Sequence, residues 1–414
     1  MISSKFRKLY LPMAVAAALG ISASAGAAVF VQCPGDTNGD AAWTGSEVQP
    51  PGTFCKHLTA GDGFATMADG RQMYIFSFND VTGTSPDQVS LDLALANFVA
   101  PTLDLKEGDK FYLTLSNVGM VARPDLFDAH SIHFHGFANQ APVFDGVPEP
   151  SITPNMGSSL TYFYNLTEPG TYMYHCHFEA TEHIEMGMQG NLFVRPKQDG
   201  TPKIYNGKTY SKFVYNDGDG STGYDKEATL QLTGFDTATH EADLMVQPIP
   251  FNEIRTIYPM INGRGYPDTV NPGMLPPTQN PDYTPDNTIP SQQISARVGG
   301  GATADKKVIQ GERLLLRLSN LGVADFYTVT ALGLPMKVVG GGARQLRGPT
   351  GKDLYYDTSS VTLGGGESVE VMIDTTNVPA GTYFLYTTNL NFLSNNQEDQ
   401  GGMMTEIVIS GPGA

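Results

Sequence analysis

The stretch from Thr171 to Met188 concentrates side chains that bind metal ions. In TYMYHCHFEATEHIEMGM a cysteine stands between two histidines, a third histidine follows it by seven residues, and a methionine follows that histidine by five. Thiolate, imidazole and thioether groups are ligands of transition metals. The segment therefore predicts a metal site, and other parts of the chain must complete it. Its candidate donors are His175, Cys176, His177, His183 and Met188.

A second motif, HSIHFHG, adds three imidazoles at His130, His133 and His135. Alternate residues of a β-strand face the same side, so His133 and His135 share one face and His130 points to the other. The HCH triplet follows the same rule, with its histidines on one face and its cysteine on the opposite face. The two segments thus predict two adjoining sites.

The first of these sites collects one thiolate, two imidazoles and a thioether. These are the donors of a blue-copper electron-transfer centre, whereas structural zinc would leave the methionine unused. The opposite face offers a dense imidazole cluster that suits further copper. The first set is His130, Cys176, His183 and Met188, and the second is His133, His135, His175 and His177.

Short strands joined by turns must position these donors. The chain has 46 glycines and 28 prolines but only 16% charged residues, which predicts an all-β fold. EGDKFYLTLSNVGM near residue 108 returns as QGERLLLRLSNLGV near residue 311, and EPGTYMYHCH returns as PAGTYFLYTT. Two ordered matches at an offset of just over two hundred residues predict two copies of one β-domain, at residues 58–196 and 203–414.

The N-terminal residues predict export. Residues 1–27 have a basic start, a short apolar run and small residues at the end, as in a signal peptide, so we expect a periplasmic or extracellular protein. In residues 28–57, Cys33 and Cys55 predict a disulfide, which leaves Cys176 unpaired. No later apolar run could span a membrane. The net charge of −17 argues against a nucleic-acid partner.

At these motifs the chain resembles a known family. HSIHFHG resembles H-P-x-H-L-H-G, and HCHFEATEHIEMGM resembles H-C-H-x-x-x-H-x-x-x-x-M, of the type 1 copper domain of multicopper oxidases, the laccase-like family. One departure is that His183 stands seven residues after Cys176, where laccases usually have five. The resemblance implies two tandem cupredoxin-like Greek-key β-sandwiches.

The resemblance also implies roles for the candidate residues. The set with Cys176 would hold type 1 copper, and the four-histidine set would hold half of a trinuclear type 2/3 copper cluster. Electrons from a phenol, a metal ion or a protein would enter near His183, pass through Cys176 and reach the cluster along His175 and His177. Dioxygen would there be reduced to water.

The second copy lacks the other cluster histidines. Its residues Tyr327, Thr330 and Leu332 replace those of HSIHFHG, and Tyr386, Thr387 and Thr388 replace HCH. Three hypotheses remain. Subunits of a homo-oligomer could complete the cluster between them. The protein could instead be a non-enzymatic electron carrier or copper-binding protein. Third, it could resemble copper nitrite reductase, which has an aspartate at the position of His133 and takes a histidine from a second domain.

The remaining histidines, and the carboxylates near the copper motifs, are assigned no role. His57 and His240 are expected at the surface, and Glu179, Glu182 and Glu185 are interpreted as solvated loop charges. The segment from residue 36 to residue 47, DTNGDAAWTGSE, spaces its oxygen donors like a calcium loop but has alanine at the sixth position, so a solvated turn is favoured.

Overall fold

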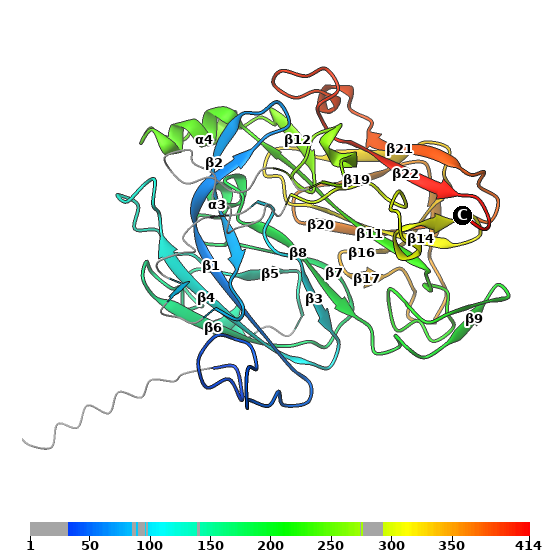
Figure 1. Ribbon diagram of the computed structural model, residues 1–414, viewed down its shortest axis with the longest axis horizontal. Helices are drawn as coiled ribbons and strands as arrows, with labels where there is room; N and C mark the ends of the chain where they lie inside the picture. The colour runs from blue at the N-terminus through cyan, green and yellow to red at the C-terminus, as the bar shows by residue number, and fades with distance from the viewer. Residues whose placement is uncertain are drawn as a thin grey trace, which may run out of the picture. The chain divides into compact units, whose positions relative to one another are not determined.

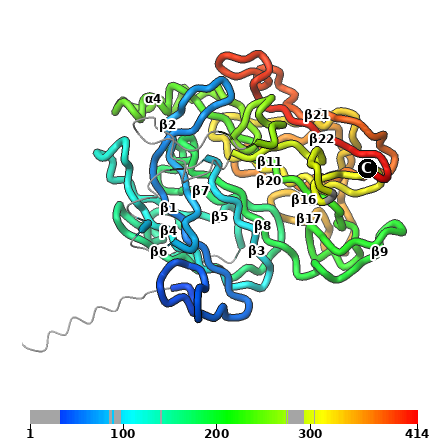
Figure 2. The backbone as a smooth tube through the Cα atoms, in the orientation of Figure 1, coloured from blue at the N-terminus to red at the C-terminus, as the bar shows by residue number. Residues whose placement is uncertain are grey.

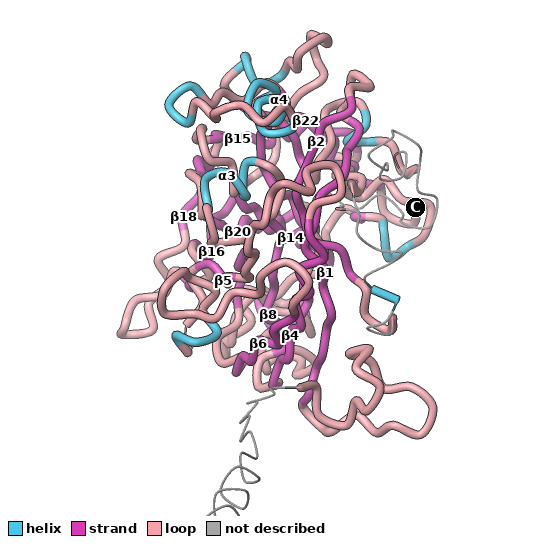
Figure 3. The backbone as a smooth tube through the Cα atoms, turned by 90° about the vertical axis from the view of Figure 1, so that its left-hand side faces the viewer, coloured by secondary structure: helices cyan, strands magenta, loops and turns pink. Residues whose placement is uncertain are grey.

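Strands make up most of the regular structure of the chain (Figure 3). The computed structural model describes residues 32–84, 88–89, 96, 98–138, 141–273, 275 and 293–414. The predicted signal peptide, residues 1–27, lies outside this part. Residues 32–414 form one compact unit. Within the described residues, no helix is long and apolar enough to cross a membrane.

The first copy is a sandwich of two four-stranded sheets (Figure 1). One sheet has the order β2-β1-β4-β6 and the other has the order β3-β8-β7-β5. The first consists of β1 (Thr53–Thr66), β2 (Gln72–Asp80), β4 (Lys110–Gly119) and β6 (Ser159–Asn165). The second consists of β3 (Leu103–Lys106), β5 (His133–His135), β7 (Gly170–His175) and β8 (Gln189–Arg195).

The second copy repeats this strand order with additions. Its sheets run β12-β11-β14-β20-β16-β17, with β18 beside β16, and β13-β22-β21-β15-β19. The first contains β11 (Lys226–Phe235), β12 (Tyr258–Ile261), β14 (Arg313–Asn320), β16 (Met336–Gly341), β17 (Arg344–Gln345), β18 (Tyr356–Thr358) and β20 (Glu367–Asp374). The second contains β13 (Val308–Ile309), β15 (Tyr327–Ala331), β19 (Val361–Leu363), β21 (Gly381–Thr387) and β22 (Met404–Ser410). The fold class of two tandem β-sandwiches is confirmed.

Smaller elements join these sheets (Figure 2). Two α-helices matter for the site, α3 (Ala180–Glu185) and α4 (Thr237–Leu244). A two-stranded ribbon follows the first copy, with strands β9 (Lys203–Tyr205) and β10 (Lys208–Tyr210). The 3-10 helices are η1 (Pro142–Phe144), η2 (Phe251–Glu253), η3 (Asp268–Val270), η4 (Ala304–Lys306) and η5 (Leu390–Leu393).

The repeated S-N-x-G motif makes the same turn in both copies. β1 pairs in parallel with β4, as β11 does with β14. The Asn117 side-chain oxygen accepts a 3.0 Å bond from the Gly119 amide, and the Asn320 oxygen accepts a 2.7 Å bond from the Gly322 amide. The motif recurs because an asparagine side chain closes the turn at the strand end in each copy.

The core of the first sandwich reaches the copper-motif residues. Aromatic rings from both sheets fill it, and the rings of Phe134 and Tyr164 stack with centroids 3.9 Å apart. Cys176, Met186 and Met188 belong to the same buried cluster. The sulfur atoms are therefore held by close-packed neighbours rather than by a mobile loop.

Buried polar contacts join the two copies beside the HCH strand. The Thr171 amide donates a 3.0 Å bond to the Glu370 carboxylate, and Arg317 donates a 2.9 Å bond to the Thr171 hydroxyl. The guanidinium of Arg317 also lies 5.1 Å from the ring centre of Phe193. These contacts fix β7 against β14 and β20 of the second copy.

The N-terminal segment is attached to β1 by the Cys33–Cys55 disulfide. In the loop that follows Cys33, carboxylate oxygens of Asp36, Asp40 and Glu47 lie within 4.8 Å of one another. Asp36 accepts bonds of 2.7 and 2.8 Å from the amides of Gly39 and Ala41. The carboxylates therefore have partners within the loop itself.

Candidate metal centre

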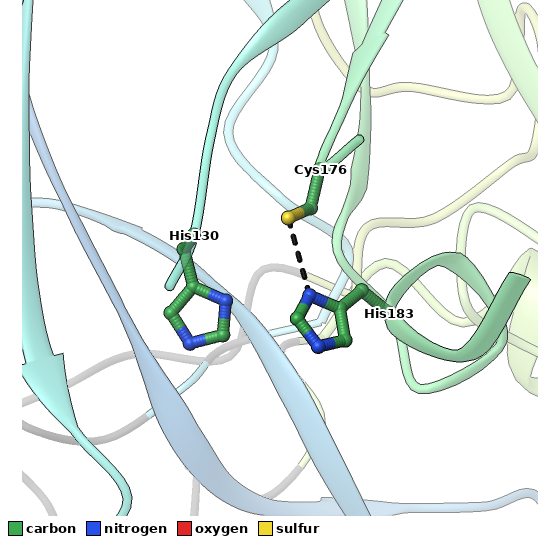
Figure 4. A group of neighbouring side chains, drawn as sticks. All are labelled: His130, Cys176 and His183. Atoms are coloured by element: carbon green, nitrogen blue, oxygen red, sulfur yellow. Dashed lines mark hydrogen bonds between the residues drawn. The ribbon is translucent and has the colours of Figure 1, made fainter. Parts of the chain in front are cut away.

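The structure brings His130, Cys176 and His183 together at a buried point (Figure 4). One donor atom of each lies within 4.8 Å of the others, and the Cys176 sulfur lies 3.2 Å from His183 Nδ1. His130 stands just before β5, Cys176 follows the last residue of β7, and His183 lies in α3. Three separate elements thus converge on one site.

The donors of this site fit a copper ion. Both ring nitrogens of His130 are buried without a hydrogen-bond partner, as is Nε2 of His183. Burial of an unpartnered polar atom costs about 1–3 kcal/mol, which a bound metal would offset. Burial also holds the pKa of His130 well below its usual range, so the ring stays in the neutral form that binds metals. A thiolate and two imidazoles suit copper.

Met188 is pinned beside these donors by the backbone. Its amide donates a 2.8 Å bond to the His183 carbonyl, and its carbonyl accepts a 3.1 Å bond from the Cys176 amide. Helix α3 explains the longer spacing between Cys176 and His183. The helix begins after Glu179, whose φ of 46° turns the chain, and its coil takes up the additional residues.

A second group consists of His133, His135 and His175, whose donor atoms also lie within 4.8 Å of one another. His133 pairs with His175 across the β5–β7 ladder. Nδ1 of His135 lies 3.2 Å from Nε2 of His175. Two nitrogens bound to one ion at about 2.0 Å in tetrahedral geometry would lie about 3.3 Å apart, so this spacing fits a shared ion.

Hydrogen bonds select the tautomers of two of these rings. Nδ1 of His133 lies 2.7 Å from the Asp145 carbonyl, and Nδ1 of His175 lies 2.8 Å from the Cys176 carbonyl. A carbonyl only accepts, so each Nδ1 carries the proton and each Nε2 keeps a lone pair for a metal. Burial lowers the pKa of His175 to about 3, which keeps it neutral.

His177 lies alongside this group rather than in it. Its ring centre is 5.1 Å from that of His133 and 5.7 Å from that of His175. Its amide donates a 3.1 Å bond to the Ser131 hydroxyl. The structure therefore gathers three of the four histidines of the second predicted set at one point, with the fourth as a neighbour.

Three residues near the sites were not identified from the sequence. A carboxylate oxygen of Asp128 lies 3.8 Å from His183 Nε2, and Asp145 contacts His133. Gly366 of the second copy faces the other group, since a methyl group there would lie 2.7 Å from His135 Nε2. None of the three belongs to a motif with ligand spacing, and Gly366 has no side chain that could have signalled a role.

Three predictions about unassigned residues are wrong. His57 and His240 are 2% and 1% exposed, not surface residues. His57 Nε2 lies 2.8 Å from the Ser116 hydroxyl, and His240 Nδ1 lies 2.5 Å from the Tyr74 carbonyl. Burial lowers the pKa of both to about 4. Glu185 is 2% exposed because it lies on the inner side of α3, and burial raises its pKa to about 8.

Gly366→Ala is expected to disturb the histidine group without disturbing the cysteine site. The added methyl would meet His135, and a φ of +87° already disfavours a side chain there. Gly351→Ala is the matched control, because Gly351 has a φ of +84° with nothing within 4 Å of the new methyl. We expect Gly366→Ala alone to lower copper content while leaving the blue absorption intact. Equal copper content in the two variants would contradict this.

Comparison with family models matches both copies. Residues 88–199 and residues 259–410 each match a model described as multicopper oxidase. A multicopper oxidase of Talaromyces pinophilus is 33% identical over 119 residues, which are 28% of this chain and 18% of the relative. A laccase of Ustilaginoidea virens is 32% identical over 119 residues, which are 28% of this chain and 17% of the relative. The chain thus aligns with less than a fifth of the length of either relative.

Solved structures of similar fold span most of the chain. A blue copper oxidase of Nitrosomonas europaea has a TM-score of 0.61 and 19% identity, with 86% of each chain covered. A copper nitrite reductase of the same organism has a TM-score of 0.56 and 16% identity, with 86% of this chain and 94% of that chain covered. At these identities the likeness shows the fold alone, and it confirms the predicted cupredoxin-like sandwiches.

Proposed function

Since the chain belongs to the multicopper oxidase family, we propose that it is a laccase-like oxidoreductase that couples one-electron oxidation of a reductant to the reduction of dioxygen. The observation that carries the proposal is the buried group of His130, Cys176 and His183 beside an imidazole group. Copper, when bound, supplies the one-electron redox chemistry that these side chains lack. His130, Cys176, His183 and Met188 would hold the type 1 ion, and His133, His135, His175 and His177 would hold further copper.

The dipeptide His175–Cys176 links the two sites. The Cys176 side chain faces His183, while the backbone carbonyl of Cys176 accepts a hydrogen bond from His175 Nδ1. One peptide unit therefore orients a ligand of each site and provides a short covalent path for electrons. Burial of both residues excludes water from this path.

The cluster would be completed between subunits of a homo-oligomer. No residue of the second copy replaces the missing histidines: all of the chain's histidines except His240 precede it, and His240 is buried against Tyr74. Where the chain's own second copy meets His135, it presents the backbone of Gly366. His133 and His177 are only partly buried, so the group has an open side. A two-fold contact would place two such groups face to face.

One observation favours a second candidate. His133, His135 and His175 of a single chain bring their donor atoms within 4.8 Å of one another, which suits one copper ion without a partner. A protein with a type 1 site and a separate three-histidine copper site would have the metal complement of copper nitrite reductase, whose fold this chain shares, but with His133 at the position of that enzyme's aspartate and all three histidines in the first copy. The predicted signal peptide and the Cys33–Cys55 disulfide support export to the periplasm or beyond for either candidate.

Copper per chain, measured with oxygen uptake on a phenolic reductant, separates the candidates. A shared three-copper cluster in a dimer predicts about two and a half ions per chain with oxygen consumed. A three-histidine single-ion site predicts about two ions per chain, and nitrite consumption in place of oxygen uptake. About one ion per chain with no uptake would overturn both and leave an electron carrier or copper-binding protein.

A further inference from the structure

We propose that the electron donor is a small, basic electron-transfer protein that docks directly above His183. This inference rests on the proposed function, because it names the reductant of the same site. The docking surface is an exposed apolar group, here called the donor patch. It consists of Val121, Phe127, Met245 and Val246, which are 47%, 73%, 66% and 63% exposed.

The imidazole edge of His183 is covered rather than open. The residue is 0% exposed, and its Nε2 is buried. Two segments far apart in the chain, here called the cover, adjoin this edge. They are residues 120–128 of the first copy, whose Asp128 carboxylate lies 3.8 Å from Nε2, and helix α4 of the second, whose Asp243 interacts electrostatically with His183. Arg123 joins them by donating to the Asp243 carbonyl and lies 3.3 Å from the Asp243 carboxylate. Leu126 and Leu244 both pack against the first core from this cover.

The residues of the donor patch are exposed residues of these two segments or directly follow them. Phe127 precedes Asp128, whose carboxylate lies 3.8 Å from His183 Nε2. Met245 and Val246 directly follow α4, which bears the Asp243 bound by Arg123. Large apolar side chains gathered on a soluble surface mark interaction sites, whereas isolated ones do not.

Carboxylates are frequent on the segments that bear the donor patch and on the loop before α3, and they form its rim in this proposal. Asp125 and Glu241 are 52% and 61% exposed, and Glu179 is exposed on the loop before α3. Among the described residues of this rim, Arg71 offsets Glu241, while Arg123 faces two carboxylates, Asp125 and Asp243. Glu179 and one of the two carboxylates beside Arg123 therefore carry the excess negative charge. An apolar centre with an acidic rim complements a protein whose redox centre lies under an apolar surface ringed by lysines.

The covered edge favours a protein over a small reductant. A phenol must reach the imidazole edge for fast transfer, and His183 is 0% exposed. A protein donor passes an electron from its own covered centre through the docked surfaces. One electron would leave the donor, which is oxidised, and the copper that His130, Cys176 and His183 would hold would be reduced by one electron. No bond forms or breaks, and no proton needs to move.

The test measures binding of cytochrome c, a basic haem protein with a lysine-ringed haem edge, to the metal-free full chain. We expect Phe127→Ser with Met245→Ser to weaken binding about tenfold. The matched control, Ile204→Ser with Leu390→Ser, removes apolar residues of 73% and 68% exposure elsewhere and should leave binding within about twofold. Glu241→Gln should weaken binding more than Asp357→Asn, a distant change at an 81% exposed side chain.

Equal losses in the patch and control variants, or no binding at about 10 mM ionic strength, would overturn the proposal. A second measurement uses the copper-loaded protein without oxygen. Reduced cytochrome c should bleach the blue absorption faster than hydroquinone does, and the patch variant should slow only cytochrome c. Faster bleaching by hydroquinone in all variants would also overturn it. Binding to the metal-free chain needs no copper, so a failure of the oxidase function would appear separately, as absent oxygen uptake with patch-dependent binding retained.

Discussion

We expect Cys176→Ser to abolish the intense blue absorption predicted for the copper-loaded protein. That absorption arises from a copper–thiolate bond, which a hydroxyl group cannot replace. The only sulfur within reach as a thiolate is Cys176, because Cys33 and Cys55 are paired in a disulfide. The substitution replaces the sulfur atom with a less polarisable oxygen atom and nearly preserves the volume of the side chain. The buried core should therefore keep its packing. An absorption spectrum and a copper count would check the result.

Met186→Leu is the matched control for Cys176→Ser. Met186 is 0% exposed, lies in the same core cluster and carries a thioether, but it is not a predicted ligand. We expect this variant to keep the blue absorption at full intensity. Cys176→Ser should lose about one copper ion per chain while the histidine group keeps its copper. A blue colour that survives Cys176→Ser would contradict the assignment of the type 1 site.

We expect Arg317→Met to destabilise the folded protein by about 3–5 kcal/mol. The guanidinium is 1% exposed, lies 3.0 Å from the Glu227 carboxylate and donates to the Thr171 hydroxyl. Burial raises the pKa of Glu227, but bonds from Arg195 and Arg317 outweigh it and lower that pKa to about 2. Without Arg317 the partly buried carboxylate of Glu227 loses one of its two cations, and the fully buried Glu370 side chain loses its neighbouring positive charge. Urea unfolding would measure the loss.

Arg344→Met is the control, because it removes a cation from the same boundary between the copies but at its surface. Arg344 is 57% exposed and pairs with Glu168, which is 36% exposed. Such an exposed pair contributes about 0–1 kcal/mol. Arg317→Lys should fall between the two, since lysine keeps the charge but cannot reproduce the planar set of donors. Similar losses for Arg317→Met and Arg344→Met would show that the buried network does not hold the two copies together.

In the proposal, the first copy and helix α4 of the second together form the surface on which the electron donor docks. Arg123 and Asp243, which close the cover, are separated by 120 positions in the chain. A small reductant needs access to the imidazole edge, but His183 is 0% exposed and its neighbour segment is bound to α4 of the second copy. A buried edge suits the proposed donor, which transfers electrons through its own surface.

The sequence alone determined the partition of the donors. Strand alternation assigned His130 and Cys176 to one side and His133, His135 and His175 to the other, and the structure gathers them in these same groups. The sequence also predicted the repeat of the two β-domains, because the S-N-x-G turns and the alternating strands depend on neighbours within a few residues. Local periodicity and local hydrogen bonds can be predicted directly from the order of residues.

Only the tertiary structure decided what surrounds those donors. His57 and His240 look like ordinary polar residues, yet both are buried by partners in other strands, Ser116 and Tyr74. The approach of Asp128 to His183 and of Gly366 to His135 likewise joins segments with no common motif. The physical reason is that burial and long-range contacts arise from how the two sandwiches and their connecting segments pack. The spacing of residues within a single segment does not predict that packing.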